Sequence, residues 1–249
     1  MCTVTLIARR NSYALGMNRD EKLTRPAGLP PRLTHLNGRT IIAPSEPSGG
    51  AWIGVNDTGA TLALINWYSV TARVAGQPVS RGEVVKLALT SDSPTEVEAA
   101  LSELPLIRVI PFRLIGVFLS LKAVVEWRWN LKQLVRLHHS WRTNTWISSG
   151  FDEPGAQQTR GKTFSEARGQ SSINGTDWLR RLHCSHGPER GPYSTCMHRE
   201  DAATVSYTEV RVSLHKATMR YTPGAPCLTA PISDICLQLG NVGGTAEPT

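Results

Sequence analysis

The first 21 residues, MCTVTLIARRNSYALGMNRDE (1–21), decide the fold. Residues 3–8 are mostly β-branched or apolar and alternate loosely, which predicts a strand that begins almost at the N-terminus. Asn11-Ser12 is a turn signal, and residues 13–17 are predicted as the returning strand. We therefore expect a hairpin that carries residues 18–20 back beside Cys2.

Cys2 is the candidate nucleophile of a hydrolase. Removal of Met1, which is usual before a small residue, would leave Cys2 with a free α-amino group. A free amine titrates at about 7.7–8.0 and a thiol at about 8.5, so this amine can accept the thiol proton near neutral pH. The alternative is an incidental small residue at the start of a strand, and the position of Cys2 by itself favours that alternative.

The polar run from Asn18 to Glu21 gives this position more weight. The hairpin would place Asp20 where its carboxylate can hold the α-ammonium group. Arg19 would lower the pKa of the thiol or bind an acidic group of a substrate. The alternative is a polar surface loop whose charges pair with one another.

The rest of the chain is predicted from its periodicity and its turn residues. Further strands are expected at residues 51–55, 61–66, 114–121, 123–129, 132–137, 145–149, 193–212 and 216–221. One helix is expected after Ser80, and a second starts at the Ser93-Pro94 signal and ends near Leu104. Mainly irregular structure is expected at 22–50, at 150–176 apart from a short helix, and after Pro231, with a helical turn at 178–183.

This order of elements predicts an α+β fold in which two stacked antiparallel sheets are flanked by helices. Residues 1–236 are expected to form a single domain and residues 237–249 a flexible tail. The chain contains no GxGxxG, no P-loop and no GxSxG motif, which excludes several common enzyme classes.

Composition further limits the partners and the compartment that we expect for this protein. Apolar residues make up 40% of the 249 residues, enough for a packed core, and the net charge of +7 comes from scattered Lys and Arg. Such scatter argues against nucleic acid as a partner. Residues 111–127 are too interrupted by charge to span a bilayer. Five cysteines imply no disulfide framework, and the cytoplasm, where thiols stay reduced, is the expected compartment.

A metal site is the one alternative that cysteine and histidine raise. His183, His186, Cys196 and His198, with Cys184, could supply soft ligands, but their spacing is not that of a standard zinc finger. Cys196 is more simply a strand residue. Neither a metal nor a cofactor is expected.

The sequence resembles the NRDE family, which includes the transport and Golgi organisation protein 2 group. The family is named after the residues that stand here as Asn18, Arg19, Asp20 and Glu21. Further matches are AWIGVNDTGATLALINW at 51–67 and STCMHREDAATVSYTEV at 194–210. The resemblance is poorest at 150–192.

The family in turn resembles N-terminal nucleophile hydrolases of the penicillin V acylase and bile salt hydrolase type. This resemblance implies that the fold is a four-layer αββα sandwich. It also implies that the protein cleaves non-peptide amide bonds. It implies that Cys2 is the nucleophile and that Asp20 holds the α-amino group. Asn66 matches an asparagine of the oxyanion hole, a contribution of roughly 3–4 kcal/mol in comparable sites.

Three positions depart from the acylase pattern. The acylases carry an arginine three residues before the aspartate, where this chain has Met17, and Arg19 stands next to Asp20 instead. Ser149 stands where they have a second asparagine. Arg190 and Arg199 are the candidates for their second arginine.

The sequence therefore predicts an amidohydrolase of N-acyl amides, with Cys2, Asp20, Asn66 and Arg19 in its catalytic site. Asn18, Trp67 and Ser149 are expected to contact the small-molecule amide or acyl substrate. The alternative is a binding or trafficking protein for acyl-CoA, lipid or haem on the same fold.

Overall fold

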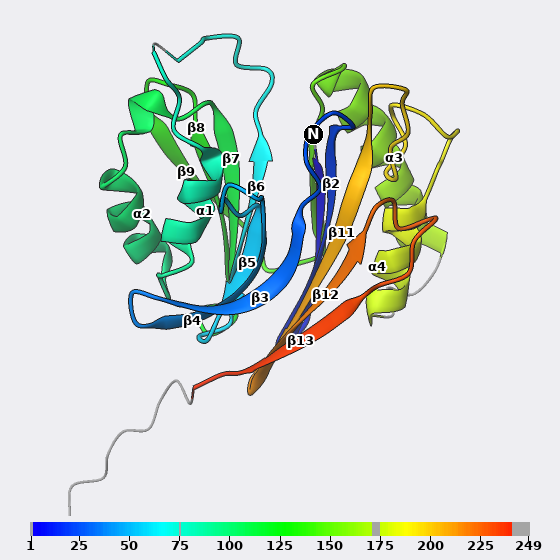
Figure 1. The fold of residues 1–249 in the computed structure, drawn as a ribbon. Coiled ribbons are helices and arrows are strands. Elements are labelled where there is room, and N and C mark those ends of the chain that lie inside the picture. The colour runs from blue at the N-terminus through cyan, green and yellow to red at the C-terminus, as the bar shows by residue number, and fades with distance from the viewer. Residues whose placement is uncertain (1, 75, 171–174, 241–249) are drawn as a thin grey trace, which may run out of the picture.

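Four layers make up the structure, a computed structural model that describes residues 2–74, 76–170 and 175–240. Two antiparallel sheets are stacked face to face, and a pair of helices covers the outer face of each (Figure 1). The predicted αββα sandwich is confirmed.

The two sheets contain six and seven strands. The six-stranded sheet has the order β10-β1-β2-β11-β12-β13, and the seven-stranded sheet runs from β3 to β9 in sequence order. The strands of the six-stranded sheet are β1 (Cys2–Ala8), β2 (Ser12–Lys22), β10 (Asn144–Ser148), β11 (Ala202–Ser213), β12 (Lys216–Pro223) and β13 (Ser233–Gln238). Those of the seven-stranded sheet are β3 (Leu29–Leu36), β4 (Arg39–Ser45), β5 (Ile53–Asn56), β6 (Ala60–Asn66), β7 (Phe112–Phe118), β8 (Ala123–Trp129) and β9 (Leu134–His139).

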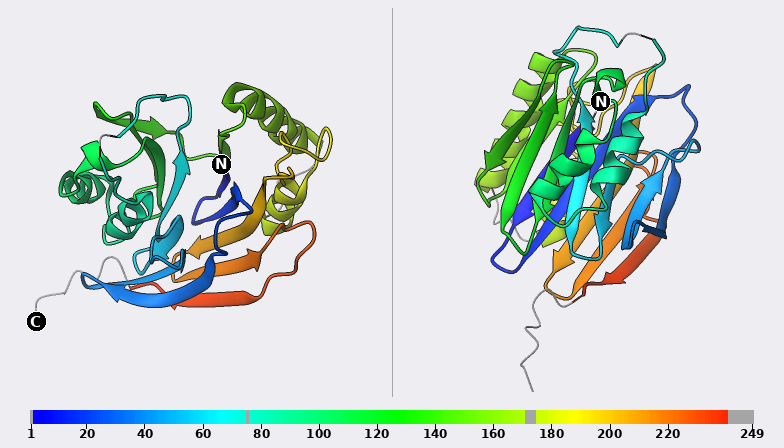
Figure 2. Two further views of the ribbon diagram at one scale, coloured as in Figure 1. Left: turned by 45° about the horizontal axis from the view of Figure 1, so that its top comes forward. Right: turned by 90° about the vertical axis from the view of Figure 1, so that its left-hand side faces the viewer.

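Helices α1 (Arg81–Ala88) and α2 (Pro94–Ser102) cover the seven-stranded sheet, and α3 (Glu153–Gln170) and α4 (Gly175–Cys184) cover the six-stranded sheet (Figure 2). A short 3₁₀ helix at Leu106–Arg108 follows α2 in the chain. The two predicted helix starts are confirmed: the hydroxyl of Ser80 accepts the Gly82 N–H, and that of Ser93 accepts the Glu96 N–H. These bonds satisfy amide groups that a helix leaves unpaired at its first turn.

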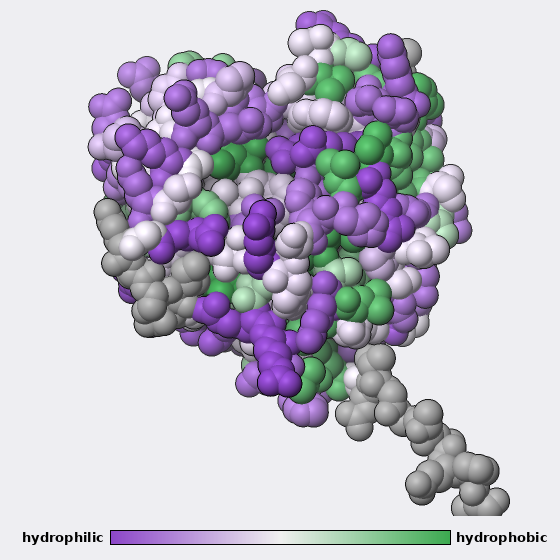
Figure 3. All heavy atoms as spheres, turned by 180° about the vertical axis from the view of Figure 1, so that it is seen from behind, coloured by the Kyte–Doolittle hydropathy of each residue, from purple (hydrophilic) through white to green (hydrophobic). Residues whose placement is uncertain are grey.

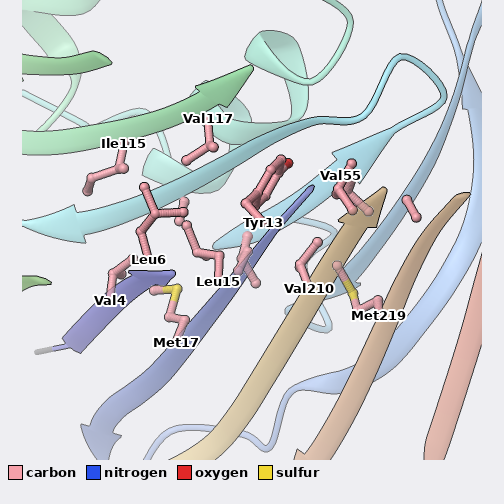
Figure 4. Packing of buried hydrophobic residues seen from close by; sticks show 14 of the residues in the cluster. Val4, Leu6, Tyr13, Leu15, Met17, Val55, Ile115, Val117, Val210 and Met219 are labelled. Atoms are coloured by element: carbon pink, nitrogen blue, oxygen red, sulfur yellow. The ribbon is translucent and has the colours of Figure 1, made fainter. Parts of the chain in front are cut away.

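The main core lies between the two sheets. Because side chains alternate along a strand, every second residue of β1 and β2 points into this space. Val4 and Met17 lie there opposite Ile115 and Val117 of the other sheet (Figure 4). Two further apolar clusters fill the spaces between each sheet and its helices.

The N-terminal hairpin forms as predicted. Strands β1 and β2 pair directly from Cys2 opposite Arg19 to Ala8 opposite Tyr13. Strand β2 is longer than expected and continues through the polar run to Lys22, so the residues after Met17 lie in the sheet and not in a loop.

The prediction of a long loop at 22–50 is wrong, because the segment contains the hairpin of β3 and β4. The overlooked signal is Asn37-Gly38, whose φ angles of 47° and 77° suit a tight hairpin turn. Pro30 and Pro31 had argued against a strand. Strand β3 lies at the edge of its sheet and has a register shift beside these prolines, which is where a sheet tolerates proline.

The prediction of mainly irregular structure at 150–176 is also wrong. Helix α3 takes up 18 residues of it, from Glu153 to Gln170. The segment is polar, so its apolar pattern is weak, and packing of Phe164 in a cluster with Ile7 and Ala14 of the six-stranded sheet stabilises the helix. Tertiary contacts of this kind supply most helical stability in proteins. The helical turn predicted at 178–183 is confirmed as part of α4.

Two predictions near the C-terminus need correction. Residues 193–201 are not a strand: β11 begins only at Ala202, and Cys196 lies in a bend of the connection before it. Strand β13 at Ser233–Gln238 shows that the chain stays ordered after Pro231 and past the expected tail boundary at residue 237. The tail residues from 241 on lie outside the described part of the chain.

The surface carries both hydrophilic and apolar residues. Seen from behind, hydrophilic residues predominate, apolar residues gather in small patches, and a notch opens at the end where Figure 1 marks the N-terminus (Figure 3). None of the helices in the described ranges combines the length and the apolar character needed to cross a bilayer.

Candidate functional site at the N-terminus

A cavity of about 420 Å³ lies at the N-terminal end of β1, where the ends of strands of the two sheets lie opposite one another. Cys2, Asp20 and Asn66 line it together, although they come from β1, β2 and β6. Arg19 lines it as well. The four residues expected to form a catalytic site therefore share one cavity, which we call the Cys2 cavity.

The Cys2 side chain is buried, with 7% of its surface exposed. Directly paired residues of an antiparallel sheet point to the same face, so Cys2 and its partner Arg19 both face the seven-stranded sheet. Burial raises the pKa of the thiol above its ordinary value. The charge of Arg19 and the backbone N–H of Asp20 act in the opposite direction without reversing the shift.

Arg19 is already paired within the cavity. Its guanidinium donates to Glu46 at 2.8 Å and lies over the ring of Trp52, 4.5 Å from the centroid. Arg25 pairs with the same Glu46 at 3.1 Å and with Glu21 at 2.8 Å. Because two carboxylates neutralise these two arginines, the positive charge of Arg19 is largely compensated before any ligand binds.

Hydrogen bonds from α3 and β11 hold the carboxylate of Asp20 in place. Its carboxylate accepts hydrogen bonds from Arg160 at 3.0 Å and from the hydroxyl of Thr204 at 2.7 Å. A register shift in β11 between Thr204 and Ser206 sets Thr204 opposite Asp20 and Ser206 opposite Arg19. Such irregularities reorient side chains beside functional sites, and here this one fixes Asp20 at the cavity.

Asn66 is the last residue of β6 and forms the opposite wall. One N–H of its amide donates to the hydroxyl of Tyr68 at 2.6 Å. A side-chain amide carries two N–H groups. The bond to Tyr68 orients the amide and leaves the second donor for a group bound in the cavity.

Arg81, which the sequence did not single out, also lines the cavity, as the first residue of α1. Burial lowers the pKa of its guanidinium, while Tyr68 and Cys2 act in the opposite direction. No ion pair among the described residues includes Arg81. A helix start after Ser80 was predicted, but that it faces Cys2 follows only from the stacking of the sheets.

A family model described as Transport and Golgi organisation 2 matches residues 1–171. The match covers more than half of the chain and includes Cys2, the Asn18–Glu21 run, and Asn66. The chain belongs to the Transport and Golgi organisation 2 family.

The fold of this family member is similar to that of a solved structure. A mutant conjugated bile acid hydrolase from Clostridium perfringens superposes with a TM-score of 0.58 at 9% identity, over 97% of this chain and 98% of that one. Penicillin V acylase from Agrobacterium tumefaciens gives a TM-score of 0.49 at 11% identity, over 88% and 82%. A search of curated protein sequences finds no match. At 9% identity the likeness to the hydrolase shows a shared αββα fold alone.

In this family member, the three residues expected to contact substrate do not line the Cys2 cavity. Asn18 points to the other face of the sheet, fully buried, and donates to the carbonyls of His183 and Thr195 at 2.9 and 2.8 Å. Its placement corrects the expectation, because these bonds hold α4 and the connection before β11 against β2.

Trp67 and Ser149 are also placed elsewhere. Trp67 lines a different cavity, and its ring lies 5.9 Å from the guanidinium carbon of Arg128. The hydroxyl of Ser149 accepts the N–H groups of Phe151 and Asp152, just before α3. Neither residue lines the Cys2 cavity, although each directly follows a strand that ends beside it: Asn66 of β6 lines the cavity, and Ser148 of β10 pairs with Cys2.

The proposed second arginines lie outside the Cys2 cavity too. Arg190 contacts His198, and Arg199 pairs with Asp201. The arginine that does support the site is Arg160 of α3, which is fully buried behind Asp20. Sequence reasoning missed it because residues 150–176 were expected to be mainly irregular.

His183, next to Asn18, provides a stability prediction. Its ring is fully buried and packs on Tyr207 with ring centroids 5.1 Å apart, and neither ring nitrogen has a hydrogen-bond partner. Burial, and then the charge of Arg160, lower the pKa of His183 to about 3. The unfolded chain takes up this proton below about pH 6.5, so between there and about pH 3 the free energy of unfolding falls by up to about 1.4 kcal/mol per pH unit.

Urea unfolding at stepped pH values measures this slope. His183→Phe keeps a ring on Tyr207 but cannot titrate, so its unfolding midpoint should fall less steeply from pH 6.5 to 4 than that of the unmodified chain. His138→Gln removes an exposed histidine and serves as the control. Equal slopes for all three proteins would contradict the prediction.

Proposed function

We propose that this protein is a cysteine amidohydrolase that cleaves N-acyl amides, with Cys2 as an N-terminal nucleophile once Met1 is removed. The observation that carries the proposal is the convergence of Cys2, Asp20 and Asn66 on one cavity. The fold, shared with a conjugated bile acid hydrolase, supports the same chemistry class.

In the proposed reaction, the sulfur of Cys2 attacks the carbonyl carbon of the amide. The freed α-amine takes the thiol proton and then passes it to the departing amine. The second N–H of Asn66 stabilises the oxyanion. Water, deprotonated by the same amine, then hydrolyses the thioester, which releases the acid and restores Cys2.

Asp20 fits the role of holding the α-ammonium group. Arg160 and Thr204 fix its carboxylate at the end of the strand beside Cys2. A carboxylate in that position favours the charged amine and orients it toward the sulfur. Burial raises the pKa of the Cys2 thiol, so the thiol needs a proton acceptor. Cleavage of the peptide bond to Met1 would supply one, the α-amine, on the same residue.

Arg81 indicates the class of substrate. Arg19 and Arg25 form ion pairs with Glu21 and Glu46, whereas Arg81 forms no ion pair among the described residues and only feels the charge of Glu21 from a distance. A partly buried guanidinium binds a carboxylate with paired hydrogen bonds. We therefore propose that the preferred amide carries a negatively charged group.

Acylation by a β-lactone probe tests the proposal, because such a probe transfers its acyl group to a nucleophilic thiol. Intact mass should give a chain that begins at Cys2 and carries one acyl group, and peptide mapping should place that group on Cys2. A probe with a carboxylate should react faster than its methyl ester. Arg81→Gln should remove this preference, while Lys132→Gln, the same charge loss at an exposed residue, should keep it.

Two results would contradict the proposal: a labelled chain that retains Met1, or labelling of Cys2 no faster than that of the exposed Cys236. Either result would favour the alternative of a binding protein for acyl-CoA, lipid or haem. Loss of the carboxylate preference in Lys132→Gln as well would overturn only the assignment of Arg81.

A further inference from the structure

A second group of reactive side chains lies apart from the Cys2 cavity. It consists of His186, Cys196, His198 and Cys227, each of which offers one ligand atom, and these four atoms all lie within 4.8 Å of one another. The residues come from the chain after α4, from the connection before β11, and from the turn between β12 and β13. Only the tertiary fold brings them together.

Four of the six distances within this group match the edges of a metal tetrahedron. The two histidine Nε2 atoms are 3.2 Å apart, the two sulfurs are 3.4 Å apart, and the sulfurs of Cys196 and Cys227 lie 3.6 and 3.4 Å from Nε2 of His198. Zinc bonds of about 2.05 Å to nitrogen and 2.3 Å to sulfur require edges of about 3.3 Å between nitrogens, 3.6 Å between nitrogen and sulfur, and 3.8 Å between sulfurs. Four of the six distances are therefore already within a few tenths of an ångström of such a site, and the two between His186 and the sulfurs are no longer than 4.8 Å.

The surroundings hold the ligands in place. The N–H of Cys196 donates to the carbonyl of Ser185 at 3.0 Å, and the hydroxyl of Ser194 donates to the carbonyl of Cys196 at 2.6 Å. The thiol of the neighbouring Cys184 donates away from the group, to the carbonyl of Pro226. Cys196 is buried and the other three ligands are half-buried, so the group is shielded yet open to an entering ion.

We propose that His186, Cys196, His198 and Cys227 form a tetrahedral zinc site with a structural role. Two thiolates and two imidazoles in a tetrahedron are a typical zinc ligand set, and four protein ligands leave no open position for a substrate. Coordination through Nε2 leaves the proton of the His198 ring on Nδ1. The exposed Arg190, which donates to that nitrogen at 3.3 Å, therefore has to turn away.

The zinc would lock together segments that support the Cys2 cavity. The connection that carries Cys196 and His198 also supplies the carbonyl of Thr195 to Asn18 and the N–H of Met197 to the hydroxyl of Thr204. That hydroxyl in turn donates to Asp20. The site thus fixes the backing of Asp20 and does not take part in chemistry at Cys2.

Metal analysis of the full chain, purified under reducing conditions, tests the site. We expect one zinc per chain, and titration of the metal-free chain with Co²⁺ should give the visible bands and the thiolate charge-transfer band of a tetrahedral complex. Cys227→Ser should weaken zinc binding at least about tenfold, because it removes a thiolate ligand. Cys236→Ser, which removes an exposed thiol of β13, should bind zinc like the unmodified chain.

Co²⁺ titration of the unmodified chain does not depend on a variant that folds. The absence of a tetrahedral cobalt spectrum in the reduced chain would overturn the proposal. Equal zinc affinity of Cys227→Ser and Cys236→Ser would overturn it too. So would a Cys196–Cys227 disulfide whose reduction creates no zinc affinity, since that result would mean that the two thiols approach each other only as a redox pair.

Discussion

Replacing Cys2 with alanine is expected to abolish turnover of an N-acyl amide, with a loss of roughly 10⁴-fold or more in kcat. The substitution removes the sulfur that forms the proposed acyl intermediate. Cys2→Ala leaves the α-amine, Asp20 and Asn66 in place, so binding of the substrate should change far less than kcat. Steady-state kinetics with N-acyl amides measure both.

Two controls make the result specific to the thiol. Cys2→Ala removes one buried sulfur, and circular dichroism and an unfolding curve should show a folded chain that is at most slightly less stable. Cys236→Ala, at an exposed position, should leave kcat unchanged. Turnover by Cys2→Ala at the rate of the unmodified chain would falsify the assignment of the nucleophile.

Replacing Arg160 with methionine is expected to destabilise the chain by about 3–5 kcal/mol, because it leaves Asp20 buried without its ionic partner. The guanidinium donates to Asp20 at 3.0 Å and to the hydroxyl of Thr3 at 2.9 Å, and both members of the ion pair have fully buried side chains. A second nitrogen donates to the carbonyl of Pro192 at 3.3 Å, so the connection before β11 loses a bond as well. Urea unfolding at neutral pH measures the loss.

A matched substitution lies on the same helix. Lys162→Met also removes a positive charge from α3, but its side chain is exposed and pairs only loosely with Glu166 at 3.8 Å, so we expect a change within about 0.5 kcal/mol. In the double variant Arg160→Met with Asp20→Asn the loss should be smaller than the sum of the single losses, since no buried charge remains. A loss for Arg160→Met no larger than for Lys162→Met would refute the role of the pair.

The parts of the fold that the sequence predicted correctly depend on local rules. The hairpin of β1 and β2 follows from alternation and a turn signal, and the starts of α1 and α2 follow from Ser80 and Ser93 as caps. In each case the residues that set the structure lie within a few positions of one another. Such signals can be read from the sequence because they do not depend on distant parts of the chain.

The predictions that failed concern segments stabilised by distant partners. Helix α3 has a weak apolar pattern and forms where Phe164 can pack on the six-stranded sheet. Strand β13 pairs with β12 at the edge of the same sheet. Residues 193–201, which were predicted as a strand, form turns and bends instead. None of these partners can be identified from spacing along the chain.

The candidate site shows the same division. The sequence by itself determined that Cys2 begins a strand, that Asp20 returns beside it and that the helix after Ser80 starts where it does, because each depends on neighbours in the chain. Only the tertiary structure decided that Asn66 and Arg81 face Cys2, that Arg160 backs Asp20, and that His186, Cys196, His198 and Cys227 meet. The physical reason is that side chains far apart in sequence become neighbours only when the sheets stack and the helices pack, and burial then fixes which of their charges remain unpaired.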